Sequence, residues 1–238
     1  MSLKKELFPP PESLGEAEFI ASQRIVPELL ESAYYQGYFP WPDESVDFIP
    51  WAHPLERGII EVEAFHIPHM VERMIRQLKF EIRIDTAFDE VIEACSLRRN
   101  GEASWITPEV IKCYKDFHRA GWAHSVEAWN REQGTLAGGL YGVSVGGVFA
   151  GESMFFRESG ASKYALAALG MILKKCRVAI LDTQMVTPTT GLFGSHYVPR
   201  QEYVELLKKH RSAPLDSETL RRAAGAIFGH GCSMIFQK

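Results

Sequence analysis

Residues 123–182 constrain the fold more than any other part of the chain. Three stretches in succession have the pattern of β-strands, 123–130, 136–143 and 148–156, and Val145-Gly146-Gly147 predicts a tight hairpin turn between the last two. An apolar helix is expected at 162–175 and a short buried strand at 178–182. Antiparallel strands followed by a strand–helix–strand unit predict an α/β fold with a mixed sheet.

The flanking sequence predicts further elements and a division into two domains. Helices are expected at 27–36, 68–78, 87–97, 108–119 and 200–210, with strands at 80–84 and, at an edge, Ser233 to Phe236. Residues 1–60 hold most of the prolines and little regular pattern, so we expect a small N-terminal domain there and a main domain over 61–238.

Charge and cysteine content exclude several classes of protein. The 26 Lys and Arg against 30 Asp and Glu give a net charge of −4, which does not favour wrapping a long nucleic acid. The four cysteines lie far apart, which argues against a zinc cluster or other metal chemistry. Neither a signal peptide nor a membrane-spanning stretch is visible, so we expect a cytoplasmic protein.

Three sequence patterns that resemble known sites are better explained structurally. The glycines between Gly138 and Gly151 lie within a hairpin, not between a strand and a helix, so they indicate bulges or close ligand approach more than a nucleotide loop. His124-Ser125-x-Glu127 is not a convincing hydrolase triad, because neighbours in a strand point to opposite faces. His66-x-x-His69 fits a capping or surface role better than a metal pair.

Two acids in apolar strands are the stronger functional signal. Glu152 lies inside 148–156, and Asp182 ends the strand expected at 178–182, with Gln184 close behind. Buried carboxylates need a partner, so each either meets an internal base or faces a cleft that receives a cation. The turn from Arg157 to Ser162, between a strand and a helix, resembles a degenerate pyrophosphate loop of acetyl-CoA-dependent N-acetyltransferases, or is an ordinary helix cap.

Read together, these residues resemble the leucyl/phenylalanyl-tRNA-protein transferases, through many short blocks in the same order. The blocks are Phe8-Pro9-Pro10-Pro11, Ala33-Tyr34, Gly37, Phe39-Pro40-Trp41, Trp51, Pro54, Arg57, Trp105-Ile106-Thr107, Tyr114, His118, Gly121, Ala123-His124-Ser125-Val126-Glu127, Trp129, Gly138-Gly139-Leu140-Tyr141-Gly142-Val143, Gly151-Glu152-Ser153-Met154-Phe155, Ala161-Ser162-Lys163, Ala165-Leu166, Asp182, Gln184 and Pro199-Arg200.

The resemblance implies a catalytic domain related to the N-acetyltransferase (GNAT) fold and transfer of Leu or Phe from aminoacyl-tRNA to an N-terminal Arg or Lys, which marks the acceptor protein for degradation by the N-degron pathway. It implies no cofactor and no metal. Trp41, Trp105 and Tyr114 match aromatics that help hold the 3′ adenosine, which suits base stacking.

The same resemblance assigns the pocket and the reacting groups. Phe149 and Met154, with Ser153 between Glu152 and Met154, are expected beside the apolar pocket for the Leu or Phe side chain. We expect Glu152 to receive the Arg or Lys side chain of the acceptor, and Asp182 to orient Gln184, whose amide carbonyl contacts the attacking amine.

Two departures from the family pattern leave specificity open. Residues 185–194 lack the Asn, His and Ser-Leu-Gly usual after the Asp-x-Gln pattern, and Phe19-Ile20-Ala21-Ser22 replaces Gly-Gly-Asp-Leu. The alternatives are an acetyl-CoA-dependent N-acetyltransferase that uses the Arg157–Ser162 turn and a non-catalytic binder of basic N-termini.

Overall fold

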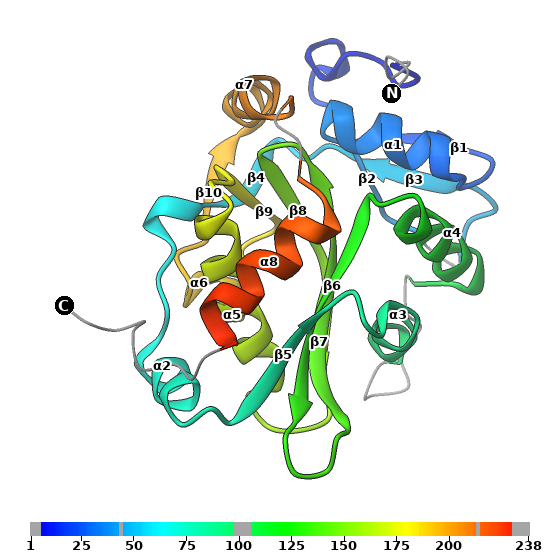
Figure 1. The fold of residues 1–238 in the computed structure, drawn as a ribbon. Helices are drawn as coiled ribbons and strands as arrows, with labels where there is room; N and C mark the ends of the chain where they lie inside the picture. Colours follow the sequence, from blue (N-terminus) through cyan, green and yellow to red (C-terminus); the bar gives the residue numbers. More distant parts are fainter. Residues whose placement is uncertain (1–5, 43–44, 98–105, 213–214, 230–238) are drawn as a thin grey trace.

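The computed structural model describes residues 6–42, 45–97, 106–212 and 215–229, and it folds them into two sheets surrounded by helices (Figure 1). In chain order the elements are η1 (Pro11–Leu14), β1 (Phe19–Ser22), α1 (Pro27–Gln36), β2 (Phe39–Pro40), β3 (Ile49–Ala52), β4 (Glu56–Glu61), η2 (Val62–Ala64), α2 (His69–Arg76), β5 (Phe80–Ile84), α3 (Phe88–Ser96), α4 (Pro108–Arg119), β6 (Ala123–Asn130), β7 (Leu136–Val145), β8 (Val148–Phe156), α5 (Ala161–Lys175), β9 (Ile180–Gln184), α6 (Pro188–Gly191), β10 (His196–Pro199), α7 (Arg200–His210) and α8 (Ser217–Phe228).

The larger sheet has the strand order β10-β4-β9-β8-β7-β6-β5. All neighbouring strands in it are antiparallel except β8 and β9, which are parallel and joined through α5. The mixed α/β class and the mixed sheet are therefore confirmed. A smaller sheet has the order β1-β3-β2.

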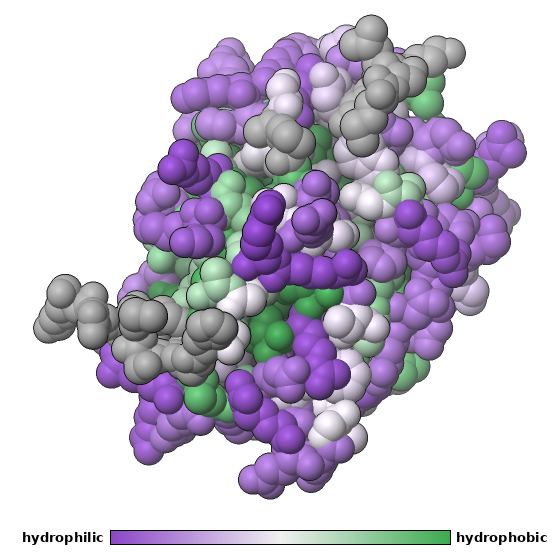
Figure 2. Space-filling model, viewed as in Figure 1, coloured by the Kyte–Doolittle hydropathy of each residue, from purple (hydrophilic) through white to green (hydrophobic). Residues whose placement is uncertain are grey.

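Alternation along the strands gives the larger sheet a hydrophobic core on each face. Tyr141 of β7 packs with α1, α3 and α4 on one face, and its neighbour Leu140 packs with α2, α5 and α8 on the other. The outer sides of α7 and α8 carry hydrophilic side chains, which cover much of the face in Figure 2. Both faces of the central strands are buried. A side chain on these strands can therefore reach a ligand only where two neighbouring strands separate.

Most predicted elements are present, and three helices have the predicted bounds: 27–36, 108–119 and 200–210. Thr107 caps the second of these by accepting a hydrogen bond from the Val110 amide at 3.3 Å. Helix α8, which begins after the cap residue Asp216, was not predicted. The edge strand expected at Ser233 to Phe236 lies outside the described residues.

The bounds predicted for the strand at 178–182 were wrong, because it spans Ile180–Gln184. Arg177 adopts a left-handed conformation with φ 59°, and the Val178 amide bonds back to the Leu173 carbonyl at 3.0 Å, so the end of α5 uses these residues. As a result Asp182 lies in the middle of β9 and Gln184 ends it.

The boundary between the two expected domains falls within a strand. Residues 56–61 form β4, which lies between β9 and β10 in the larger sheet. The small three-stranded sheet is built from residues before β4. A boundary near residue 60 stays a prediction.

The larger sheet divides between β8 and β9. Their parallel pairing covers Val148↔Ile180 to Ala150↔Asp182, after which β8 continues beside β7 and β9 ends beside β4. A register shift at Tyr141/Gly142 accompanies the separation. Gly142 has no room for a side chain, since a Cβ there would lie 2.3 Å from the Ala150 carbonyl oxygen and 2.4 Å from Phe149 Cε1.

We expect Gly142→Ala to lower the free energy of unfolding by about 1–3 kcal/mol, because the added methyl group meets backbone and a buried ring. The matched control is Gly225→Ala in α8, where nothing lies within 4 Å of the added atom. Alanine in a helix should stabilise that site by about 0.5–1 kcal/mol. Urea unfolding of the two variants measures both, and equal effects would contradict the packing argument at Gly142.

Candidate active site

A pocket of about 260 Å³ lies where β8 and β9 separate. Its lining divides into two kinds of residue. The apolar part comes mainly from β7, β8, β9 and α5: Leu140, Met154, Leu166, Leu169 and Leu181. The polar part comes from β8, β9 and the chain that follows β9: Glu152, Ser153, Thr183, Gln184, Thr187 and Thr190. Pro40, the last residue of β2, and the next residue, Trp41, also line the pocket, and Trp41 is 38% exposed.

Glu152 is the half-buried carboxylate of this pocket. Its Oε1 accepts a hydrogen bond from Gln184 Nε2 at 2.9 Å, and its Oε2 accepts one from the Tyr114 hydroxyl at 3.2 Å. The hydroxyls of Tyr114 and Tyr34 contact each other. Burial raises the pKa of Glu152 to about 7, although hydrogen bonding from Tyr34 and Tyr114 favours the carboxylate.

Asp182 is fully buried and forms an ion pair with Arg57 of β4. Arg57 donates from Nε to Oδ1 at 2.8 Å and from Nη2 to Oδ2 at 2.6 Å. The Tyr203 hydroxyl of α7 donates to Oδ2 at 2.8 Å, and the Gln184 backbone amide donates to Oδ1 at 2.9 Å. Asp182 therefore has its charge neutralised inside the protein, whereas Glu152 faces the pocket.

Gln184 connects the two acids. Its backbone amide bonds to Asp182 and its side-chain amide nitrogen bonds to Glu152. With the nitrogen directed to Glu152, the amide oxygen is the acceptor that Gln184 can present to a ligand. The backbone of Gln184 has φ 61°, a left-handed conformation that is uncommon for residues other than glycine and asparagine.

Comparison with known proteins identifies a family over most of the chain. The family model described as leucyl/phenylalanyl-tRNA protein transferase matches residues 59–208. A protein of Akkermansia muciniphila named leucyl/phenylalanyl-tRNA–protein transferase is 45% identical over 189 residues, which is 79% of this chain and 97% of that protein. One of the same name from Herpetosiphon aurantiacus is also 45% identical over 189 residues, 79% of this chain and 95% of its own.

The chain belongs to the leucyl/phenylalanyl-tRNA protein transferase family. Among solved structures, a functionally unknown conserved protein from Staphylococcus epidermidis matches with a TM-score of 0.39 and 10% identity, over 76% of this chain and 69% of that one.

The residues that the family resemblance singled out are only partly brought together by the structure. Trp41, Glu152, Ser153, Met154 and Gln184 line the pocket, and Asp182 lies directly behind Gln184. The roles given to them stay predictions. Trp105 lies outside the described residues.

Tyr114 and Phe149 are near the pocket but do not line it. The Tyr114 ring is fully buried, 5.4 Å from the Tyr141 ring between centroids, and only its hydroxyl reaches the site through Glu152. Phe149 is also fully buried, and its ring lies against Gly142. In this structure neither ring presents a face to a ligand, so stacking of adenosine on Tyr114 stays a prediction.

Sequence reasoning gave no role to Arg57, Tyr203 or Tyr34. Arg57 is a cation directly before the apolar residues Gly58-Ile59-Ile60 of β4, a weaker signal than that of Glu152, since β4 also carries Glu56 and Glu61. The expectation that each acid meets either a base or a cleft holds, because Asp182 meets Arg57 and Glu152 lines the pocket.

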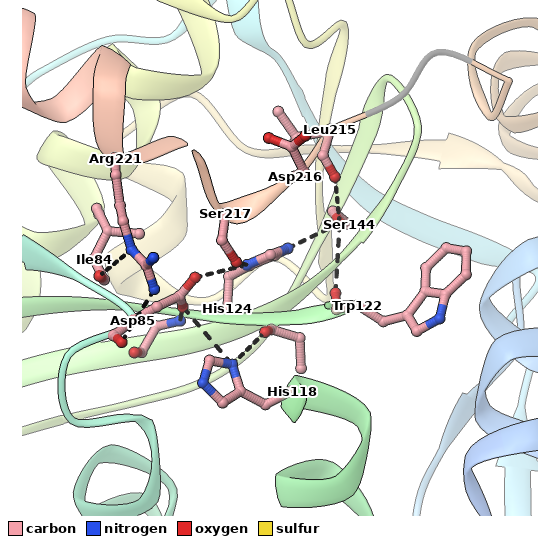
Figure 3. Close-up of polar contacts among 12 residues, drawn as sticks. Ile84, Asp85, His118, Trp122, His124, Ser144, Leu215, Asp216, Ser217 and Arg221 are labelled. Carbon is pink, nitrogen blue, oxygen red and sulfur yellow. Dashed lines mark hydrogen bonds and ion pairs between the residues drawn. The ribbon is translucent and has the colours of Figure 1, made fainter. Parts of the chain in front are cut away.

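The His124 region forms a separate polar cluster (Figure 3). His124 lies between Asp85, 3.0 Å from Nδ1, and Ser144, 3.1 Å from Nε2. Ser125 on the other face donates to Glu127 at 2.8 Å. His124 and Ser144 are buried, and Ser144 also contacts the Leu215 carbonyl at 3.3 Å. The arrangement ties the start of α8 to the sheet and gives a substrate no access to the serine.

The other patterns singled out in the sequence show no ligand geometry. At the Arg157–Ser162 turn, Ala161 and Ser162 are buried, and a Cβ on Gly160 would lie 2.6 Å from Met74 Cε. His69 is exposed and contacts Glu72 at 3.2 Å. Within the described ranges no group of His, Cys, Asp and Glu could hold a metal ion, and no helix there is long and apolar enough to cross a membrane.

The raised pKa of Glu152 makes a prediction about stability. Its native value of about 7 lies above its ordinary value of 4.5, so the native state holds this proton more tightly than the unfolded chain. Glu152 therefore costs more stability as pH rises from 4.5 to about 7, and the cost is constant above that.

We expect Glu152→Gln to gain stability relative to the wild type between about pH 5 and about pH 8, since the amide cannot titrate. Urea unfolding at both pH values measures the difference, and other titrating groups cancel in the comparison. A difference that does not change with pH would contradict the shifted titration of Glu152.

Proposed function

We propose that this protein transfers Leu or Phe from aminoacyl-tRNA to the N-terminal Arg or Lys of acceptor proteins, which marks them for the N-degron pathway. The observation that carries the proposal is the pocket between β8 and β9, in which an apolar wall and one carboxylate lie together. Membership of the family supplies the reaction class.

The apolar wall suits the donor side chain. Leu166 and Leu169 of α5, with Leu140, Met154 and Leu181 from the strands, offer no charged group to a Leu or Phe side chain. Apolar pockets discriminate weakly between side chains of similar size, so one site can accept both. Trp41 offers an exposed ring at the pocket for the 3′ adenosine, where stacking is worth about 1–3 kcal/mol per base.

Glu152 suits the acceptor. It is the sole carboxylate among the described residues that line the pocket, and no Lys or Arg is among them. Asp182 cannot serve a ligand in the same way, because Arg57 occupies both of its oxygens. A buried carboxylate without a cation is costly, and an arriving guanidinium or ammonium group relieves that cost.

The reaction needs orientation more than strong bases. The neutral α-amine attacks the ester carbonyl carbon, a C–N bond forms, and the C–O bond to the ribose breaks. The amine loses one proton and the ribose oxygen gains one, so no covalent enzyme intermediate is required. Gln184 is too weak a base to take the proton, but its amide oxygen can accept a hydrogen bond from the amine and align its lone pair.

The catalytic domain is, in this proposal, GNAT-like. Its support is the β8–α5–β9 unit, whose parallel strands pair over three residues and then separate at the pocket. Residues 1–60 would form the small N-terminal domain, which contributes Pro40 and Trp41 to the site.

Purified protein should transfer Leu or Phe from charged tRNA to a peptide that begins with Arg, and much less to one that begins with Ala. We expect Glu152→Gln to raise the KM for the Arg peptide by about 30-fold or more, since losing one partner of a desolvated charge pair costs about 2–5 kcal/mol. Radiolabelled amino acid incorporated into each peptide measures both effects.

The controls separate the proposal from its alternatives. The binding of a nonhydrolysable aminoacyl-adenosine should be nearly unchanged in Glu152→Gln. Acetylation from acetyl-CoA without aminoacyl transfer would make the protein an N-acetyltransferase, and binding of the Arg peptide without either reaction would make it a binder.

A further inference from the structure

We propose that Arg57 and Tyr203 are positioning residues for this transfer: together with Asp182 they form a buried clamp that fixes Gln184 and the amide oxygen it presents to the acceptor amine. The inference rests on the proposed function and adds two residues, Arg57 from β4 and Tyr203 from α7, whose roles the sequence did not indicate.

The clamp is shielded from solvent. Arg57 and Asp182 have side chains that are 1% and 0% exposed, and the guanidinium bonds to both carboxylate oxygens. The Arg57 guanidinium carbon lies 4.4 Å from the centre of the Phe39 ring and 4.5 Å from that of Tyr203. Two rings and a two-point ion pair leave the guanidinium little freedom to turn.

Gln184 is the residue that needs such support. Opposite it, β4 pairs Gly58 with Gln184 and Ile59 with Asp182, so Thr183 has no partner in the register and β9 bulges there. Gln184 then takes its left-handed backbone, and the chain passes so close to Gly58 that a Cβ would lie 2.7 Å from the Met185 carbonyl carbon. A conformation of this kind persists only where surrounding contacts hold it.

Asp182 is the member of the clamp that contacts Gln184. The same Oδ1 that accepts from Arg57 Nε accepts from the Gln184 backbone amide at 2.9 Å. Tyr203 fixes the other oxygen. Rotation of the carboxylate would therefore break the bond to the Gln184 amide and release the bulge.

The clamp also connects both sides of the pocket. Phe39, which packs on Arg57, lies edge-on to Trp41 with 5.9 Å between ring centres. Trp41 lines the pocket from the N-terminal part of the chain, and Gln184 lines it from β9. Arg57 thus sets the distance between the side offered to the donor and the group offered to the acceptor.

The test compares two tyrosines that each lose one hydroxyl. Tyr203→Phe removes the hydrogen bond to Asp182 and keeps the ring on Arg57. Tyr38→Phe is the control, since its hydroxyl bonds to the Pro9 carbonyl at 2.9 Å and does not touch Asp182. We expect Tyr203→Phe to lower kcat about 10-fold, the loss typical of one hydrogen bond to a charged group, with the KM of both substrates within about twofold. Tyr38→Phe should keep the wild-type kcat.

Arg57→Lys is the second variant, because it keeps the charge but not the two-point geometry. We expect a loss of about 100-fold in kcat, as small misplacements at a reacting centre produce, while a nonhydrolysable aminoacyl-adenosine still binds with wild-type affinity. That retained binding shows the variant to be folded. Equal kcat in Tyr203→Phe and Tyr38→Phe would overturn the clamp.

A readout without transfer keeps the clamp and the proposed function distinguishable. Hydrogen exchange of the peptide spanning residues 183–187 should be faster in Tyr203→Phe than in the wild type, and unchanged in Tyr38→Phe. If exchange of residues 183–187 is faster in Tyr203→Phe than in the wild type, but the wild type transfers no amino acid, the proposed function is contradicted and the clamp is supported. Unchanged exchange in Tyr203→Phe would overturn the clamp even in an active enzyme.

Discussion

The buried contact between Arg57 and Asp182 is the interaction on which the rest of the site depends. Removing two charges from water costs several kcal/mol per ion, and the attraction between them repays this only with good geometry and additional hydrogen bonds. Here the two-point contact, the Tyr203 hydroxyl and the Gln184 amide supply them. An apolar pair of similar volume would hold β4 to β9 as well. What the ion pair adds is direction, because a carboxylate held by three hydrogen bonds from Arg57 and Tyr203 can fix the Gln184 amide as a fourth partner.

The opening of the sheet depends on irregular pairing on both sides of it. β7 and β8 shift register at Gly142, and β4 and β9 shift between Gly58 and Ile59. Each shift occurs beside a glycine that has no room for a Cβ. A regular sheet would continue the β8–β9 pairing past Ala150↔Asp182 and fill the space with backbone. The two bulges instead turn the strands apart, so a pocket forms inside a sheet that is otherwise continuous and buried on both faces.

The sequence predicts features that depend on neighbouring residues better than contacts between residues far apart in the chain. The hairpin after β7 and the helices at 108–119 and 200–210 follow from turn residues, caps and apolar spacing, which act over a few residues. The sequence also identifies Glu152 and Asp182 as acids in apolar strands. It could not pair Asp182 with Arg57, which is 125 residues away, because that contact depends on the strand order. The start of β9 was missed for a local reason, since the left-handed Arg177 lengthens the turn after α5.

Asp182 and Glu152 lie in different environments, which agrees with the different roles proposed for them. Asp182 has its counterion inside the protein, so its charge is part of the fold. Glu152 has tyrosine hydroxyls and an amide, and burial raises its pKa to about 7, so the empty pocket readily takes up a proton. In the proposed function, an arriving Arg or Lys side chain reverses this preference, because the cation stabilises the carboxylate. The attacking α-amine, with an ordinary pKa of about 7.7–8.0, must be neutral. Once the cation is bound Glu152 is ionised, and above about pH 8 more than half of the amine is neutral, so both conditions can be met together. In the proposed function, the pocket therefore distinguishes the acceptor's side chain from its α-amine by charge: it binds the group that stays cationic and leaves the other free to react.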